Sequence, residues 1–127
     1  MPRQPRKPKR IVLMPMDEIL SPWGRIESLV GIPVVFSEIE FRVRVIGKRE
    51  VTEGIFKAWK VSRNPETDEF ELEYLGEFLT RSTVLIEQLR LYKVYVEETG
   101  QYPLCQISEV KTKNGRRYYT MISGELT

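Results

Sequence analysis

The sequence predicts an α+β fold in which a strongly bent antiparallel sheet, or a small barrel, is packed by one main helix. Two stretches alternate between apolar and polar residues, which is typical of half-buried strands. An Asn-Gly pair separates two β-prone runs near the C-terminus, and one further stretch has helical periodicity. We therefore expect a three-stranded meander and a C-terminal hairpin in a single domain, which suits a chain of 127 residues.

The first ten residues are predicted to form an extended arm in front of a globular domain at 11–127. Prolines at positions 2, 5 and 8 oppose a helix. The arm contains no acid and five cations, so that the chain's net charge of +2 leaves a mildly acidic domain. Such an asymmetry indicates a polyanion or an acidic protein surface as the partner. The five cations are Arg3, Arg6, Lys7, Lys9 and Arg10.

Short elements are expected next, including a helical turn around Ile26. The first clear strand follows Pro33, because apolar and charged side chains alternate from residue 38 to residue 45. Gly47-Lys48-Arg49 supplies a turn. A second strand at about 51–62 has three apolar residues on one face, namely Ile55, Trp59 and Val61.

A loop and a third strand complete the predicted meander. The composition of residues 64–68 is that of a loop. The strand at 69–75 alternates again, and its apolar side chains are expected to point inward, namely Phe70, Leu72 and Tyr74.

Residues 82–97 favour a helix. Ser82 or Thr83 is a suitable N-cap and Gly100 suits the C-terminal end. The β-prone residues near its end leave open whether 90–97 pass into a strand. Apolar residues nearly encircle the segment 84–96, more than one core face requires. They are Val84, Leu85, Ile86, Leu89, Leu91, Tyr92, Val94, Tyr95 and Val96.

The C-terminal hairpin is predicted from Asn114-Gly115, which lies between β-prone runs at 104–113 and 116–123. This pair is preferred in two-residue type I′ turns. Such a turn places Lys113 opposite Arg116.

Composition argues against several functions. Histidine is absent and Cys105 is the single cysteine, so one chain has too few ligands for a structural zinc site and no histidine for catalysis. We expect no metal, no cofactor and no enzymatic activity. The apolar run 11–16 is too short for a signal peptide, and no membrane span is apparent. A cytoplasmic protein is therefore expected.

Abundant charged and β-branched residues, with few amides, indicate a heat-adapted protein. Small strand-rich domains with a basic arm occur among archaeal ribonucleoprotein components. This is a likeness of composition and carries no family assignment.

Besides the arm, two groups of cations are candidate phosphate contacts. One lies on the meander: Arg42, Arg44, Lys57 and Lys60. The other lies at the hairpin tip: Lys111, Lys113, Arg116 and Arg117. Aromatic side chains near them offer faces on which bases can stack. The candidates are Phe56, Trp59 and Tyr118.

Two functions remain open from the sequence. The first is a non-enzymatic protein that binds single-stranded DNA or RNA, either alone or as a subunit of a ribonucleoprotein particle, through the arm, the meander and the hairpin tip. The second is a structural or adaptor subunit of a cellular or viral protein assembly. There the arm would dock on an acidic partner, and the apolar helix at 84–96 would provide a dimer or partner surface.

Overall fold

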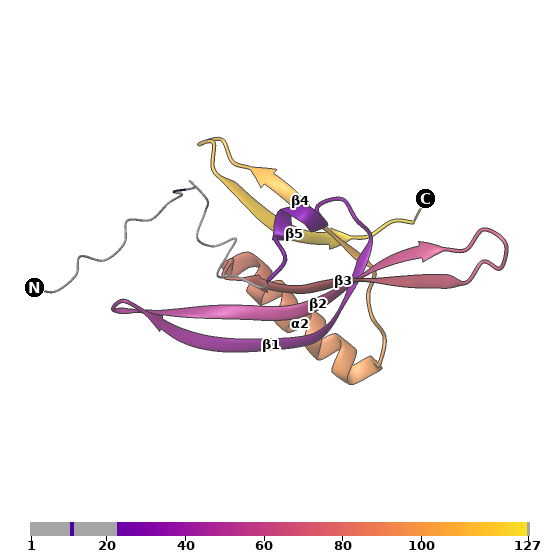
Figure 1. Ribbon diagram of the computed structural model, residues 1–127, viewed down its shortest axis with the longest axis horizontal. Helices are drawn as coiled ribbons and strands as arrows, with labels where there is room; N and C mark the ends of the chain where they lie inside the picture. The colour runs from indigo at the N-terminus through magenta and orange to yellow at the C-terminus, as the bar shows by residue number, and fades with distance from the viewer. Residues whose placement is uncertain (1–10, 12–22, 127) are drawn as a thin grey trace, which may run out of the picture.

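The computed structural model describes Ile11 and residues 23–126. This part of the chain forms a five-stranded antiparallel sheet, in the order β3-β2-β1-β4-β5, and one α-helix (Figure 1). The predicted α+β class is confirmed. The elements are η1 (Ile26–Leu29), β1 (Val34–Ile46), β2 (Arg49–Arg63), β3 (Phe70–Thr80), α2 (Thr83–Thr99), β4 (Cys105–Lys111) and β5 (Arg117–Ser123).

The predicted meander is present as β1, β2 and β3. Ile46 pairs with Arg49, so a two-residue loop joins the first two strands. Arg63 pairs with Phe70, so residues 64–69 form the loop between β2 and β3. This loop includes the predicted one at 64–68. The predicted turn at Ile26 corresponds to the 3-10 helix η1.

A bulge in β1 decides which side chains reach the core. Glu38 and Ile39 together oppose the single residue Phe56, between the pairs Ser37–Lys57 and Glu40–Ile55. The extra residue reverses the alternation. Phe36, Ile39 and Phe41 therefore all contribute to the apolar core or pack against it.

The helix α2 packs on one face of the sheet. The Ser82 hydroxyl accepts a hydrogen bond from the Leu85 amide, and Gly100 ends the helix in the left-handed conformation. Both predicted caps are confirmed, and residues 90–97 are helical throughout. Buried side chains of α2 meet those of the sheet in one core, whose members are Leu29, Val34, Phe36, Ile39, Phe56, Ala58, Phe78, Leu85, Leu89, Tyr92, Cys105 and Ile107.

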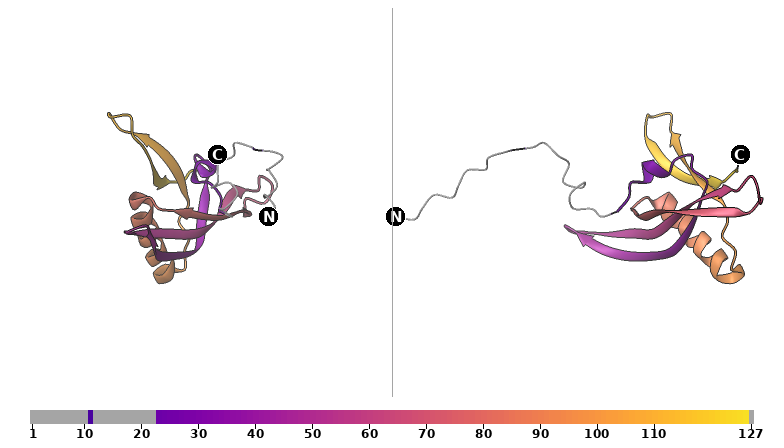
Figure 2. Two further views of the ribbon diagram at one scale, coloured as in Figure 1. Left: turned by 60° about the vertical axis from the view of Figure 1, so that its left-hand side comes forward. Right: turned by 45° about the vertical axis from the view of Figure 1, so that its right-hand side comes forward.

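The meander extends past both ends of α2. Figures 1 and 2 show the β1–β2 turn and the β2–β3 loop projecting in opposite directions beyond the helix. Val43 and Val45 lie in the first projection and are exposed. The expected burial of the apolar face of β1 is therefore wrong for its second half.

The strands β4 and β5 form a second ladder, joined to the meander by one pair, Val34–Cys105. The segment before β1 also connects the two parts, because Gly24 bridges Phe78 and Val30 bridges Ile107. A side chain at Gly24 would place its Cβ 2.4 Å from the Phe78 ring, so this close approach requires glycine.

No helix in the described part of the chain is long and apolar enough to span a membrane.

Candidate functional site

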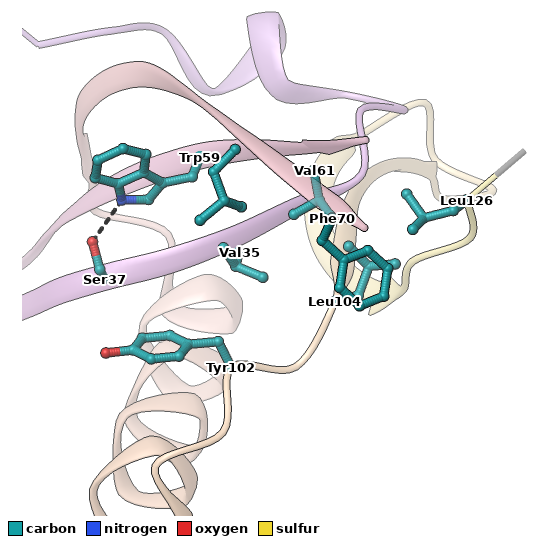
Figure 3. Close-up of a pocket in the computed structure, with 9 residues that line it drawn as sticks. Val35, Ser37, Trp59, Val61, Phe70, Tyr102, Leu104 and Leu126 are labelled. Atoms are coloured by element: carbon teal, nitrogen blue, oxygen red, sulfur yellow. Dashed lines mark hydrogen bonds between the residues drawn. The ribbon is translucent and has the colours of Figure 1, made fainter. Parts of the chain in front are cut away.

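The face of the sheet turned away from α2, which we call the outer face, carries an apolar groove. Side chains alternate along each strand, so the neighbours of the core residues Phe36 and Ala58 point to this face. The groove has a volume of about 430 Å³ and receives side chains from β1, β2, β3 and the segments flanking β4 and β5 (Figure 3). Its lining is Val35, Ser37, Trp59, Val61, Phe70, Leu72, Tyr102, Leu104 and Leu126.

The apolar side chains of β3 form one wall of this groove. They were expected to point inward, and that expectation is wrong. Phe70 is 63% exposed and Leu72 is 58% exposed, and Tyr74 is also exposed. Their part of β3 pairs with β2 in the projection beyond α2, where no helix of the described residues covers either face (Figure 1).

Aromatic rings in and beside the groove are held by specific contacts. The Trp59 indole Nε1 donates a hydrogen bond of 2.8 Å to the Ser37 hydroxyl. The Trp59 and Tyr74 ring centroids are 4.8 Å apart. The Arg63 guanidinium lies 5.4 Å from the Phe70 centroid. The groove thus combines partly exposed aromatic rings with a cation at one end.

The three predicted stacking residues have different environments. Trp59 is half-buried in the groove wall, and its stacking role stays a prediction. Phe56 is buried between Phe36 and Phe78, with centroids 4.8 Å and 5.8 Å away, so its proposed role in stacking is wrong. Tyr118 is exposed on β5, while its neighbour Tyr119 packs against the core.

The structure separates the four cations predicted on the meander. Arg42, Arg44 and Lys57 lie on the outer face, where Lys57 forms an ion pair with Glu38 that raises the pKa of the lysine. Lys60 is directly opposite the core residue Val34 and therefore belongs to the other face. Lys60 therefore does not share a face with the other three predicted cations.

Arg42 and Arg44 converge on Glu53 together with Arg81. The Glu53 side chain is 0% exposed, and its carboxylate accepts hydrogen bonds from Arg42 Nε at 2.8 Å and Arg81 Nε at 2.9 Å. Burial raises the pKa of Glu53, but these two arginines outweigh burial and hold the pKa below its ordinary value. The carboxylate is therefore ionised at neutral pH.

The β4–β5 hairpin is present, but its predicted register is wrong by one residue. Lys111 pairs with Arg117, and Thr112 N–H donates to Arg116 O, so three residues form the loop. A type I′ turn needs positive φ at both central residues, whereas only Gly115 has it, at +78°. Lys113 consequently lies in the loop, and Arg117 forms an ion pair with Glu109 at 3.3 Å.

The hairpin tip is exposed and lies apart from the groove. Lys111, Lys113 and Arg116 are exposed there. The tip and the β2–β3 loop project from different sides of the molecule (Figures 1 and 2). The five cations of the predicted arm, Arg3, Arg6, Lys7, Lys9 and Arg10, lie outside the described residues.

The cysteine and the acidic side chains of the described residues do not form a second candidate site. Cys105 is buried, and burial raises the pKa of its thiol to about 12, which suppresses the nucleophilic thiolate. Among the described residues, no three cysteine or acidic side chains converge as metal ligands would.

Sequence reasoning missed Glu53 and Arg81. A signal for Glu53 was available, because a two-residue loop at Gly47-Lys48 fixes the register and places Arg42 opposite Glu53. The position of Arg81 depends on a second bulge, in β3, where Tyr74 pairs with Trp59 and Gly76 with Ala58. The alternating pattern of β3 contains no marker of this bulge.

Comparison of the chain with protein-family models, with curated proteins and with solved structures finds no match. The groove, the charged groups and the exposed surfaces are therefore the features from which a function can be inferred.

Proposed function

We propose that this protein binds single-stranded nucleic acid on the outer face of its sheet. The observation that carries the proposal is the groove, whose partly exposed rings of Trp59, Phe70 and Tyr102 have no covering element among the described residues. Aromatic faces stack on bases of any sequence, at about 1–3 kcal/mol per base. Unpaired bases expose these faces, so a single strand fits better than a duplex.

Cations on the same face support the proposal. Arg63 lies beside Phe70, and Lys57 lies two residues from Trp59 along β2. Phosphate groups would compete for these cations with their ion-pair partners, Asp68 and Glu38. The basic arm and the hairpin tip would add sequence-independent phosphate contacts. We also infer that the sheet bends strongly or approaches a small barrel, which the bridges from Gly24 to β3 and from Val30 to β4 support.

A binding experiment tests this proposal with groove variants. Labelled oligo-dT and oligo-U are titrated at about 50 mM salt, where phosphate contacts are strong. We expect Phe70→Ala and Tyr102→Ala each to weaken binding by about five-fold or more, because each removes one stacking surface. Both side chains are largely exposed, so these variants keep the fold.

Leu91→Ala is the matched control, because Leu91 is an exposed apolar residue on α2, at the opposite side of the sheet. Its affinity should equal that of the wild type. Absence of binding to either oligonucleotide at this salt concentration refutes the proposal, as does an equal effect of all three variants.

A second function has one observation in its favour, the uncovered apolar surface of α2. Leu91 is 73% exposed, and Val84, Val94 and Tyr95 are also exposed. An apolar helix surface of this kind fits a subunit of a protein assembly. Light scattering that shows a stable oligomer, lost in Leu91→Lys, would support this function, whereas a monomer at high concentration would oppose it.

A further inference from the structure

The arginine cluster around Glu53 has a geometry that a structural ion pair does not require. The cluster consists of Arg42, Arg44 and Arg81, with Arg44 Nη1 at 3.8 Å from the Glu53 carboxylate. Arg42 and Arg81 already provide each carboxylate oxygen with a short hydrogen bond. The three guanidinium groups and the Glu53 carboxylate together carry a net charge of +2, while Glu50 and Glu87 line a hollow beside Arg81.

The donor groups of the cluster point to a further acceptor. Arg42 and Arg81 both use Nε for Glu53, and their terminal nitrogens make no hydrogen bond within the described part of the chain. A guanidinium has five N–H donors in a rigid fork that matches phosphate oxygens. All three side chains are about half exposed, so a ligand can approach the cluster, and the Arg42 guanidinium also lies 5.9 Å from the centroid of the Trp23 ring.

Glu53 holds these donors in place before a ligand binds. Its carboxylate is fully buried, and removing either short hydrogen bond would leave a buried charge poorly compensated. The arginines Arg42 and Arg81 are therefore fixed across β1, β2 and the end of β3. A preorganised pair of forks loses little conformational entropy when it binds an oxyanion.

We propose that the arginine cluster is a phosphate-binding subsite. Its ligand is either a phosphodiester of a bound nucleic-acid strand or the phosphate of a small molecule. The first source rests on the proposed function. Glu53 and Trp59 lie on the same face of β2, six residues or roughly 20 Å apart, so one strand of several nucleotides can reach both the groove and the cluster.

Arg44→Gln is the variant that tests the subsite. Arg44 makes the longest of the three contacts, so Glu53 keeps both short hydrogen bonds and the fold is preserved. Lys48→Gln is the matched control, because it removes an equal charge from the exposed turn of the same hairpin. Arg44→Lys retains the charge but loses the planar fork.

Two measurements distinguish the sources of phosphate. The first is the rise in melting temperature with inorganic pyrophosphate at constant ionic strength. We expect Arg44→Gln to weaken pyrophosphate binding by about ten-fold, Arg44→Lys to weaken it less, and Lys48→Gln to leave it unchanged. The second is the salt dependence of oligo-dT binding, whose slope should fall by about 0.7 in Arg44→Gln if one phosphodiester contact is lost.

The outcomes separate this inference from the proposed function. If pyrophosphate binding depends on Arg44 while oligo-dT does not bind, the subsite is supported, with a small phosphate compound as its ligand. The proposed function is then refuted. If oligo-dT binds and depends on Phe70, but Arg44→Gln and Lys48→Gln behave alike in both measurements, the groove stands and the subsite is refuted. Failure of the wild type to respond to either ligand also refutes the subsite.

Discussion

Tyr92 shows how one side chain joins elements that share few backbone contacts. Its hydroxyl accepts a hydrogen bond from the Phe36 amide at 3.1 Å and donates one to the Pro103 carbonyl at 2.8 Å. Burial raises the pKa of this hydroxyl, so it stays protonated and keeps its donor. Tyr92 therefore links α2, β1 and the segment before β4, close to the single residue pair that joins β1 to β4.

We expect Tyr92→Phe to lower the free energy of unfolding by about 1–3 kcal/mol, because the buried Phe36 amide loses its acceptor. Urea denaturation measures this change. Tyr95→Phe is the control, since the Tyr95 hydroxyl bonds to Gln101 at the surface, and its effect should stay within about 0.5 kcal/mol. Equal effects of the two variants would contradict the assignment to Tyr92.

At the residue scale, the sequence predicts a feature correctly where neighbouring residues alone determine the backbone conformation. Ser82 and Gly100 have the capping conformations that their types favour. Phe56 was misassigned because the identity of a residue does not say which face a helix will cover. On β1, the bulge at Glu38 reverses the alternation of the strand, and nothing in Ser37, Glu38 or Ile39 marks an extra residue.

At the element scale, Gln88 of α2 interacts with the edge strand β5. Its amide oxygen accepts a hydrogen bond from the Met121 N–H at 2.8 Å. Its amide nitrogen lies 2.9 Å from the Thr120 hydroxyl and 3.3 Å from the Met121 carbonyl oxygen. One side chain thus satisfies both backbone polar groups of Met121.

Gln88→Ala should expose these groups and loosen β5. We expect faster hydrogen exchange at the Met121 amide and a loss of about 1–2 kcal/mol in the free energy of unfolding. Glu87→Ala, at the adjacent exposed position of α2, should leave both quantities nearly unchanged. Unchanged exchange at Met121 in Gln88→Ala would show that Gln88 does not hold this edge.

The lengths of the elements explain why the burial of β3 was mispredicted. A helix of 17 residues is about 25 Å long, whereas a strand of 15 residues spans about 50 Å. The helix α2 therefore covers only part of the meander. The apolar period of β3 was correctly recognised, but its alternating pattern is the same whether a helix covers the strand or the strand projects into solvent.

At the scale of the whole molecule, Glu53 connects three strands through charge. It lies on β2 and bonds Arg42 on β1 and Arg81 directly after β3. Because its pKa is lower in the folded than in the unfolded protein, the unfolded state takes up more protons as the pH falls below about 4.5. The stabilising contribution of Glu53 is present above this pH and is lost progressively below it.

The stability difference between the wild type and Glu53→Gln should therefore shrink as the pH falls from 5 to 3. Urea denaturation of both proteins at several pH values measures it. Subtracting the two curves removes the contribution of the other carboxylates. A difference that stays constant across this range would mean that the Glu53 carboxylate is not held by its arginines.

The Gln88 contact also bears on how copies of this protein behave when crowded together. An edge strand is a template on which another chain can add as a further strand, and such addition can lead to filaments. A strand added along β5 would compete with Gln88 for the backbone groups of Met121, because Gln88 already bonds to both. We expect this amide on a neighbouring helix to oppose strand addition at Met121, alongside the charge of Arg117 at the start of the same strand.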